Sequence, residues 1–227
     1  MVRWQWFDTD AAVKLAATRF IARAASESIT SRGAFHFVLA GGSTPRAVYQ
    51  TLPSLETDWT KWHLYFGDER VLPPEHADRN SKMVLDAWLT HVPIPPHHIH
   101  PMLTEQGLVA AASAYSDLLR GIGEFDLVLL GLGEDGHTAS LFPGHTLGDA
   151  ADSPDVLQVL DAPKPPPERL SLSAQRLSRT RQVLFLVTGA GKREPVARWK
   201  RGDSIPAAAI QCVQGVDVLI DLEAWGT

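Results

Sequence analysis

The chain has 227 residues, of which 44% are hydrophobic and 21% are charged, and its formal net charge is −5. These values are ordinary for one globular domain, so we expect a single domain over residues 1–227, and the negative charge argues against nucleic acid or an anionic membrane as a partner. No stretch approaches the roughly 18 apolar residues of a membrane span, the N-terminus does not resemble a signal peptide, and a lone cysteine, Cys212, excludes an internal disulfide. We therefore expect a cytoplasmic protein.

The chain alternates between helical and strand patterns. A helix is expected from Asp8 or Thr9 to about Arg32, and further helices after Pro45, around 83–88, over 108–119 and after Gly191. Strands are expected over 35–40, 62–66, 127–130, 156–160, 169–173 (an edge strand), 182–187 and 216–222. This alternation predicts an α/β fold with a mostly parallel sheet that is covered by helices on both faces.

Four polar segments each follow the end of a predicted strand. They are 41–44, 68–70, 131–140 and 188–192. Because the carboxyl ends of parallel strands lie at one edge of a sheet, where open α/β sheets bind their ligands, we expect the four segments to line one pocket.

The segment 41–45, with the sequence GGSTP, has the composition of an anion site. Backbone N–H groups at a helix start favour a phosphate, and Ser43 and Thr44 add hydroxyl donors. The segment equally fits an ordinary turn in which Ser43 or Thr44 caps the helix. It lacks the lysine and the spacing of a nucleotide-binding P-loop.

The segment 125–145, FDLVLLGLGEDGHTASLFPGH, is the expected active site. His137 follows a buried strand among glycines, its unperturbed pKa lies near neutrality, and it therefore suits a general base that Asp135 could orient. The glycines formally match a dinucleotide fingerprint, but no acidic residue closes a clear strand about 20 residues later, so we interpret the match as coincidental.

The remaining candidates are charged residues and histidines. Arg70 and Lys192 follow two of the strand ends, where an anion would need them. His97, His98 and His100 have no metal-ligand spacing and are expected on the surface, whereas the role of His145 stays open.

Three blocks of sequence together resemble 6-phosphogluconolactonases. They are LAGGSTPRAVYQTL, YFGDERVLPPEHADRNSKMV and LVLLGLGEDGHTASLFPGH, and the later VLFLVTGAGK resembles the lysine-bearing segment of that family. The resemblance implies a three-layer α/β/α sandwich with a mostly parallel, Rossmann-like sheet, as in glucosamine-6-phosphate deaminase. It implies hydrolysis of 6-phospho-D-glucono-1,5-lactone, in the oxidative pentose phosphate pathway, without a metal or an organic cofactor.

The resemblance also assigns roles to residues. The general base falls on His137 with Asp135 as its neighbouring acid, and the substrate contacts fall on a further set of positions: Gly42, Ser43, Thr44, Arg70, Asn80 and Lys192. One departure is Arg79, which stands before Asn80 where the family usually has a small Ser. An extra cation near the pocket mouth would either touch the substrate or face solvent.

Two other functions are compatible with parts of this sequence. A glucosamine-6-phosphate deaminase or isomerase tends to continue its histidine loop with Ile-Ala-Phe-Asn-Glu and to carry Asp-Glu-Tyr in place of Asp68-Glu69-Arg70, so the segment 138–143 favours the lactonase. A non-catalytic sugar-phosphate sensor would need an output module, which we do not expect because the predicted fold begins within the first ten residues. The only partner we expect is a small sugar-phosphate lactone, bound by a monomer or a weak homo-oligomer.

Overall fold

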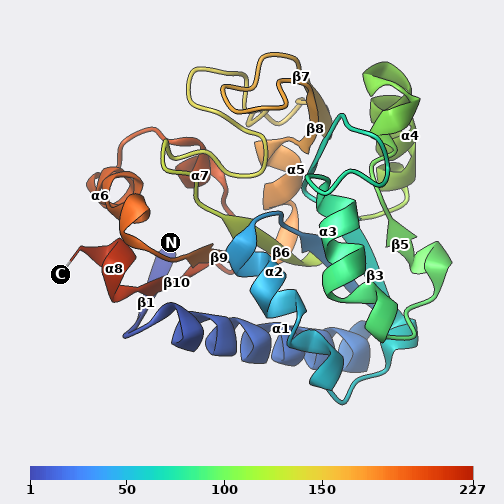
Figure 1. Ribbon diagram of the computed structural model, residues 1–227, viewed down its shortest axis with the longest axis horizontal. Helices are drawn as coiled ribbons and strands as arrows, with labels where there is room; N and C mark the ends of the chain where they lie inside the picture. The colour runs from blue at the N-terminus through green and yellow to red at the C-terminus, as the bar shows by residue number, and fades with distance from the viewer. Residues whose placement is uncertain (227) are drawn as a thin grey trace.

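The central element of the computed structural model, which describes residues 1–226, is a seven-stranded parallel sheet (Figure 1). Its strand order is β1-β10-β9-β6-β2-β3-β5, and every neighbouring pair runs parallel. Helices cover both faces. The predicted α/β/α sandwich with a Rossmann-like sheet is therefore confirmed.

The strands of the sheet are β1 (Val2–Phe7), β2 (Phe35–Leu39), β3 (Trp62–Phe66), β5 (Ile99–His100), β6 (Phe125–Gly131), β9 (Thr180–Val187) and β10 (Val216–Asp221). A second, antiparallel sheet has the order β4-β8-β7 and contains β4 (Asp68–Arg70), β7 (Val156–Val159) and β8 (Arg169–Leu172). The α-helices are α1 (Asp10–Arg32), α2 (Ser43–Tyr49), α3 (Asn80–Ala87), α4 (Leu108–Arg120), α5 (Ala174–Ser178), α6 (Arg193–Arg201), α7 (Pro206–Ala209) and α8 (Leu222–Trp225). The short 3₁₀ turns are η1 (Leu52–Ser54), η2 (Trp59–Lys61), η3 (Leu89–His91), η4 (Pro96–His98), η5 (Thr104–Gln106) and η6 (Ala190–Lys192). None of these helices is long and apolar enough to cross a membrane.

Helix α1 begins and ends where the sequence predicts. The Thr9 side chain accepts a hydrogen bond from the Ala12 N–H, and Gly33 ends the helix in the left-handed conformation with φ 82°. Its buried face includes Val13, Ala17 and Ile21. This face packs on the sheet beside α2, and Figure 1 shows the helix along the lower side of the molecule.

The apolar core lies between the sheet and the two helical layers. On the α2–α3 side, Trp62 packs edge-on against Phe35 and Trp88, with ring centroids 4.8 and 5.7 Å apart. On the opposite face, Phe185 of β9 packs against Trp199 of α6 at 4.9 Å. Aromatic side chains bury large apolar areas, so these clusters fix the spacing between the layers.

Several details differ from the sequence-based expectations, among them the short elements β5, α5, α7 and α8, which were not predicted. Strand β1 was not predicted, although its exposure alternates over Val2–Gln5 with the period of two that a strand imposes. Segment 68–70 is a strand rather than a loop. Strand β8 was expected at an edge but lies between β4 and β7 and is buried, because both neighbours pair with it.

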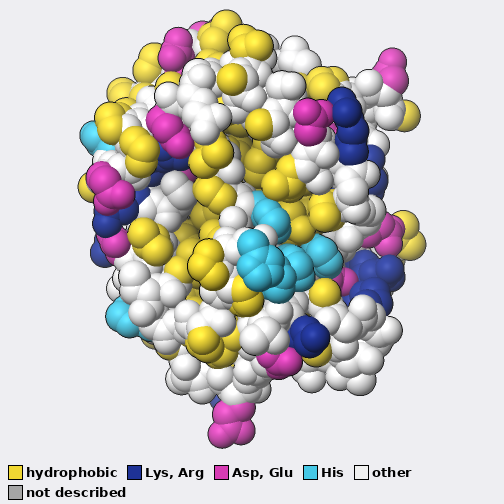
Figure 2. Space-filling model, turned by 90° about the vertical axis from the view of Figure 1, so that its right-hand side faces the viewer, with side chains coloured by type: hydrophobic (Ala, Val, Ile, Leu, Met, Phe, Trp, Pro, Cys, Tyr) yellow, Lys and Arg dark blue, Asp and Glu magenta, His cyan; other side chains and the backbone are white. Residues whose placement is uncertain are grey.

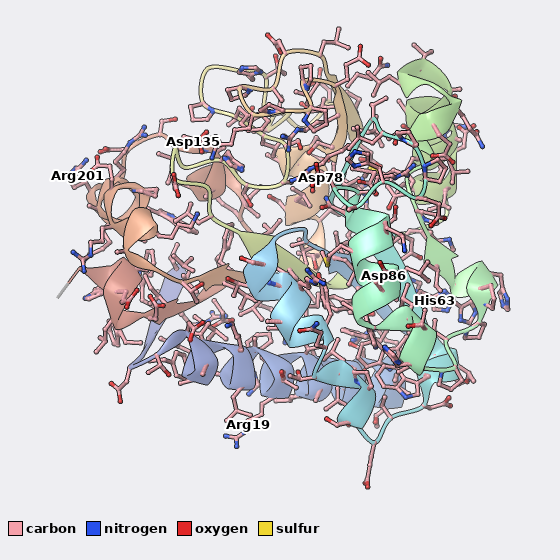
Figure 3. All side chains as sticks on the ribbon, in the orientation of Figure 1. Arg19, His63, Asp78, Asp86, Asp135 and Arg201 are labelled. Carbon is pink, nitrogen blue, oxygen red and sulfur yellow. The ribbon has the colours of Figure 1, made fainter. Side chains whose placement is uncertain are left out.

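Histidine side chains gather on the face around β5 (Figure 2). We call His36, His63, His98 and His100, which come from β2, β3, η4 and β5, the histidine stack. The His63 ring lies 4.8 Å from that of His36 and 3.8 Å from that of His98, and His63 is labelled at this end of the molecule in Figure 3. The expectation that His97, His98 and His100 lie on the surface holds for His97, which is exposed, but is wrong for His98 and His100, which are half-buried and stacked.

The stack resists protonation. Burial and the neighbouring imidazoles lower the pKa of His63 and of His100 to about 4, and burial also lowers the pKa of His36 and of His98. Asp126 opposes this shift at His36, whereas Arg32 there and Lys61 at His98 reinforce it. No group of three or more candidate ligands within residues 1–226 could hold a metal ion.

We expect the stack to make the fold sensitive to acid. The unfolded chain takes up protons below about pH 6.5 and the folded stack only near pH 4, so the free energy of unfolding falls as the pH drops between these values. Because the rings are half exposed, solvent screening should limit the loss to about 1–3 kcal/mol, or roughly 2–10 °C in Tm.

Thermal unfolding of the wild type and of His63→Phe between pH 7.5 and 4 tests this expectation. The variant keeps a stacked ring without a titrating proton and should lose less stability in acid. His91→Phe, an exposed histidine outside the stack, is the control. Parallel pH profiles of the wild type and His63→Phe would show that the stack contributes nothing to acid sensitivity.

Candidate active site

A cavity of about 300 Å³ lies at the carboxyl ends of β2, β3, β6 and β9. All four polar segments predicted from the sequence contribute to its lining, as expected for one edge of a parallel sheet. The predicted site residues that line it are Gly42, Ser43, Thr44, Arg70, Asn80, His137 and Lys192. Asp135 does not line the cavity and lies behind His137.

His137 is held by a carboxylate on one ring nitrogen. Its Nδ1 lies 2.5 Å from Asp135 Oδ1, which also accepts a hydrogen bond from the His137 backbone N–H at 3.1 Å. This contact assigns the ring proton to Nδ1 and leaves Nε2 as the basic nitrogen. A Cβ on Gly133 would collide with the His137 ring, so the glycine at this position gives the imidazole its space.

The electrostatic surroundings keep this pair in the form that a base requires. Burial lowers the pKa of His137, and this effect outweighs the hydrogen bond to Asp135, which raises it. Burial would raise the pKa of Asp135, but the hydrogen bonds from His137 outweigh it and lower the pKa of the carboxyl. At neutral pH the pair is therefore a neutral imidazole beside a carboxylate.

The histidine loop is fastened to the neighbouring strand ends. Ser140 Oγ donates to Asp68 Oδ2 at 2.5 Å, and the Thr138 hydroxyl donates to the Gly131 carbonyl at 2.9 Å. The Asn80 amide donates to the other carboxylate oxygen of Asp68 at 3.0 Å. Asp68 thus joins the histidine loop to the start of α3, and Ser140 is a structural partner without the surroundings of a nucleophile.

A second group of polar side chains lies at the ends of β2 and β9. The hydroxyls of Thr44 and Thr188 are 2.8 Å apart, and the nearby Lys192 ammonium is half-buried. Burial lowers the pKa of Lys192, while Glu134 raises it. The predicted helix cap is wrong here: Gly42, with φ 103°, is the N-cap, so Ser43 and Thr44 belong to the first turn, where neither caps the helix and both line the cavity.

Arg79 differs from both alternatives that the sequence left open. Its side chain is 2% exposed, so it faces neither solvent nor the cavity, and its Nη1 lies 2.6 Å from Glu105 Oε2. Arg70, by contrast, lines the cavity and donates from Nη1 to the Asp78 carbonyl at 2.9 Å.

Two further cations line the cavity and were missed in the sequence. Arg169 is 5% exposed and donates to the carbonyls of Lys164 and Pro166, so it fixes the proline-rich segment that carries Lys164. The signal that could have found them is a lysine within a stiff APKPPP segment followed by a strand that begins with arginine.

The other histidine and glycine features do not form a second site. His145 lies 3.4 Å from Asp161 and does not line the cavity. The glycine-rich match at 131–136 is followed by turns and an isolated bridge rather than by a helix, so it lacks the helix N-terminus that binds a dinucleotide pyrophosphate.

Comparisons with known proteins agree with this architecture. A family model described as glucosamine-6-phosphate isomerases/6-phosphogluconolactonase matches residues 8–219. The 6-phosphogluconolactonase of Mycobacterium tuberculosis is 36% identical over 234 residues, which cover 96% of this chain and 94% of that protein.

Two solved structures share the fold over nearly the whole chain. The 6-phosphogluconolactonase of Thermotoga maritima superposes with a TM-score of 0.90 at 23% identity, covering 97% of this chain and 100% of that one. A monomeric glucosamine-6-phosphate deaminase superposes with a TM-score of 0.84 at 22% identity, covering 98% of each chain. The chain therefore belongs to the glucosamine-6-phosphate isomerase/6-phosphogluconolactonase family.

Proposed function

We propose that this protein hydrolyses 6-phospho-D-glucono-1,5-lactone to 6-phosphogluconate, the lactonase step of the oxidative pentose phosphate pathway. The observation that carries the proposal is the carboxylate-held imidazole of His137 in a cavity that it shares with four cations, Arg70, Lys164, Arg169 and Lys192. The named lactonase relative, which is 36% identical over most of the chain, supports the same reaction.

The base in this reaction is the Nε2 atom of neutral His137. It takes a proton from water as the water oxygen attacks the lactone carbonyl carbon. Asp135 keeps the Nδ1 proton in place and stabilises the imidazolium that forms. The carbonyl oxygen becomes an oxyanion, for which backbone N–H groups of the glycine-rich loops or the ammonium of Lys164 would be the stabilising groups.

The tetrahedral intermediate then collapses. The bond between the carbonyl carbon and the ring oxygen breaks, and the ring oxygen takes the proton back from the His137 imidazolium. The ring opens to the hydroxy acid, and the imidazole is neutral again. The mechanism needs no covalent intermediate, and neither candidate nucleophile is activated. The Ser140 hydroxyl is hydrogen-bonded to Asp68, and burial raises the pKa of the Cys212 thiol.

The phosphate is the natural anchor for a substrate of this shape. Ser43, Thr44, Arg70 and Lys192 offer hydroxyl, guanidinium and ammonium donors on the cavity wall, and Arg169 adds a further buried cation. Holding the phosphate at a fixed distance from His137 would place the carbonyl carbon for attack.

The deaminase alternative is favoured by no observation at the site. The segment after His137 uses Thr138 and Ser140 to fasten the loop to Gly131 and Asp68, in agreement with its lactonase-like sequence. A sensor without catalysis would not need an imidazole held by a carboxylate.

The first test concerns the reaction itself. Purified protein should hydrolyse 6-phosphogluconolactone well above the spontaneous rate and should release no ammonia from glucosamine 6-phosphate. Both products can be measured on one preparation. Ammonia release without lactone hydrolysis would replace the proposal by the deaminase, and binding without either reaction would replace it by the sensor.

The second test concerns Lys192. Charge-assisted contacts to an anion contribute on the order of 1.5–3 kcal/mol, so Lys192→Ala should lower kcat/KM for the phosphorylated lactone about 10- to 150-fold. The loss should largely disappear with unphosphorylated gluconolactone. Lys200→Ala, which removes a lysine that lies over the Trp225 ring outside the cavity, is the matched control. Equal losses on both lactones would assign Lys192 to the chemistry or the fold instead.

The third test concerns His137. General-base catalysis contributes about 10²–10⁴-fold, so His137→Asn should lower kcat by this factor with little change in the affinity for 6-phosphogluconate. His145→Asn, which lies outside the cavity, should retain normal kcat. A folded His137→Asn protein with near-normal kcat contradicts the assignment.

The pH profile gives an independent check of the same residue. A protonated imidazole cannot accept a proton, so the wild-type kcat/KM, which reports the ionisation of the free enzyme, should fall in acid. Because burial lowers the pKa of His137 from its ordinary value of 6.5, the midpoint of this fall should lie below pH 6.5. A midpoint above 6.5 would show that another group controls the rate.

A further inference from the structure

We propose that Arg79 is a positioning residue for Arg70: it holds the two segments that restrain Arg70, and it thereby sets the affinity of the cavity for a sugar phosphate. The inference rests on the proposed function in taking Arg70 as a phosphate contact. It concerns a buried arginine that does not itself line the cavity.

Arg79 binds three acceptors from a buried position. Its Nη1 donates to Glu105 Oε2 at 2.6 Å and to the Leu72 carbonyl at 3.2 Å, and its Nη2 donates to the Met102 carbonyl at 2.9 Å. The side chain is 2% exposed. One guanidinium therefore joins the loop after β4 to the segment 102–105, which are separate in the sequence.

Arg70 is restrained at two points, and each lies beside an Arg79 contact. The Thr104 hydroxyl donates to the Arg70 carbonyl at 2.9 Å, and Thr104 stands between two of the residues that Arg79 binds. The Arg70 guanidinium donates to the carbonyl of Asp78, the residue before Arg79. Asp78 lies above the first turn of α3 in Figure 3. Fixing Arg79 thus fixes both the backbone and the side chain of Arg70.

A buried carboxylate completes the arrangement. Glu69 is 0% exposed, accepts hydrogen bonds from the backbone N–H groups of Arg70 and Asn80 at 2.8 Å each, and lies 3.5 Å from Arg79 Nε. Removing the guanidinium would leave this buried charge without its counter-ion and the Met102 and Leu72 carbonyls without their donor. The segment that carries Arg70 would then no longer be held in one conformation.

A purely structural role for Arg79 makes a different prediction. Lost packing and lost ion pairs would lower the free energy of unfolding, whether or not Arg70 is present. A positioning role acts through Arg70, so its effect on ligand affinity must disappear once the Arg70 side chain is gone. A double-mutant cycle separates the two roles.

The experiment measures the Kd for 6-phosphogluconate by calorimetry for the wild type, Arg79→Ser, Arg70→Ala and the double variant. Arg79→Ser should weaken binding about 10-fold, the scale of coupling between residues in one polar network. The double variant should bind no more weakly than Arg70→Ala alone. Additive losses, or unchanged affinity in folded Arg79→Ser, would overturn the proposal.

Two further variants keep the test decisive. Arg176→Lys alters another fully buried arginine, which donates to the Ile122 and Arg179 carbonyls, and should lower Tm without changing the Kd. Where Arg79→Ser does not fold, Glu105→Ala removes a partly exposed partner of Arg79 and should weaken binding about 3-fold, again only when Arg70 is present.

Catalysis and positioning are judged by separate measurements. A wild-type protein that binds 6-phosphogluconate without hydrolysing the lactone would refute the proposed function and leave the binding cycle to decide the role of Arg79. With hydrolysis present, Arg79→Ser should raise KM and leave kcat within about 2-fold, since it acts on binding. A protein that binds no 6-phosphogluconate at all would overturn both.

Discussion

The site depends on the burial of the Glu69 carboxylate in the middle of β4. Its two oxygens accept hydrogen bonds from three backbone N–H groups, those of Arg70, Asn80 and Ser81. A buried carboxylate is tolerated only where its lone pairs are satisfied, so these donors have little freedom to move. The start of α3 and the strand that carries Arg70 are thereby fixed to each other, and Arg70 is held at the cavity wall from the last position of β4.

A similar arrangement recurs on the other side of the cavity. Both oxygens of Asp221, at the end of β10, accept from the Gly189 N–H at 3.1 and 3.0 Å, and Oδ1 also accepts from the Ala224 N–H. This carboxylate holds the turn that leads to Lys192. Each of two cations that face the cavity therefore follows a backbone segment fastened by a buried carboxylate, and the stiffness of the parallel sheet extends into loops that begin where its ladder of hydrogen bonds ends.

The sequence predicted the layers of the fold and most of the cavity, because both follow from local patterns. Apolar strands alternate with amphipathic helices, which predicts the layers. Polar residues that follow parallel strands lie at one edge of the sheet, and this rule correctly predicted four residues of the cavity lining: Ser43, Arg70, His137 and Lys192. Contacts between segments that are distant in the sequence could not be predicted. The partners of Arg79 and the inward position of Arg169 arise from contacts between distant segments, and no periodicity in the sequence encodes them.

Burial acts on two ionisable groups of the cavity with opposite consequences. It lowers the pKa of His137 from 6.5 and of Lys192 from 10.5. The imidazole begins near neutrality, so even a modest shift makes it the neutral base that water activation requires. The ammonium begins more than three units above neutrality, and the neighbouring Glu134 opposes the shift, so the charged form that holds an anion is favoured. One low-dielectric cavity can therefore contain both a free base and an anion anchor at the same pH, and the identity of the side chain decides which of the two it becomes.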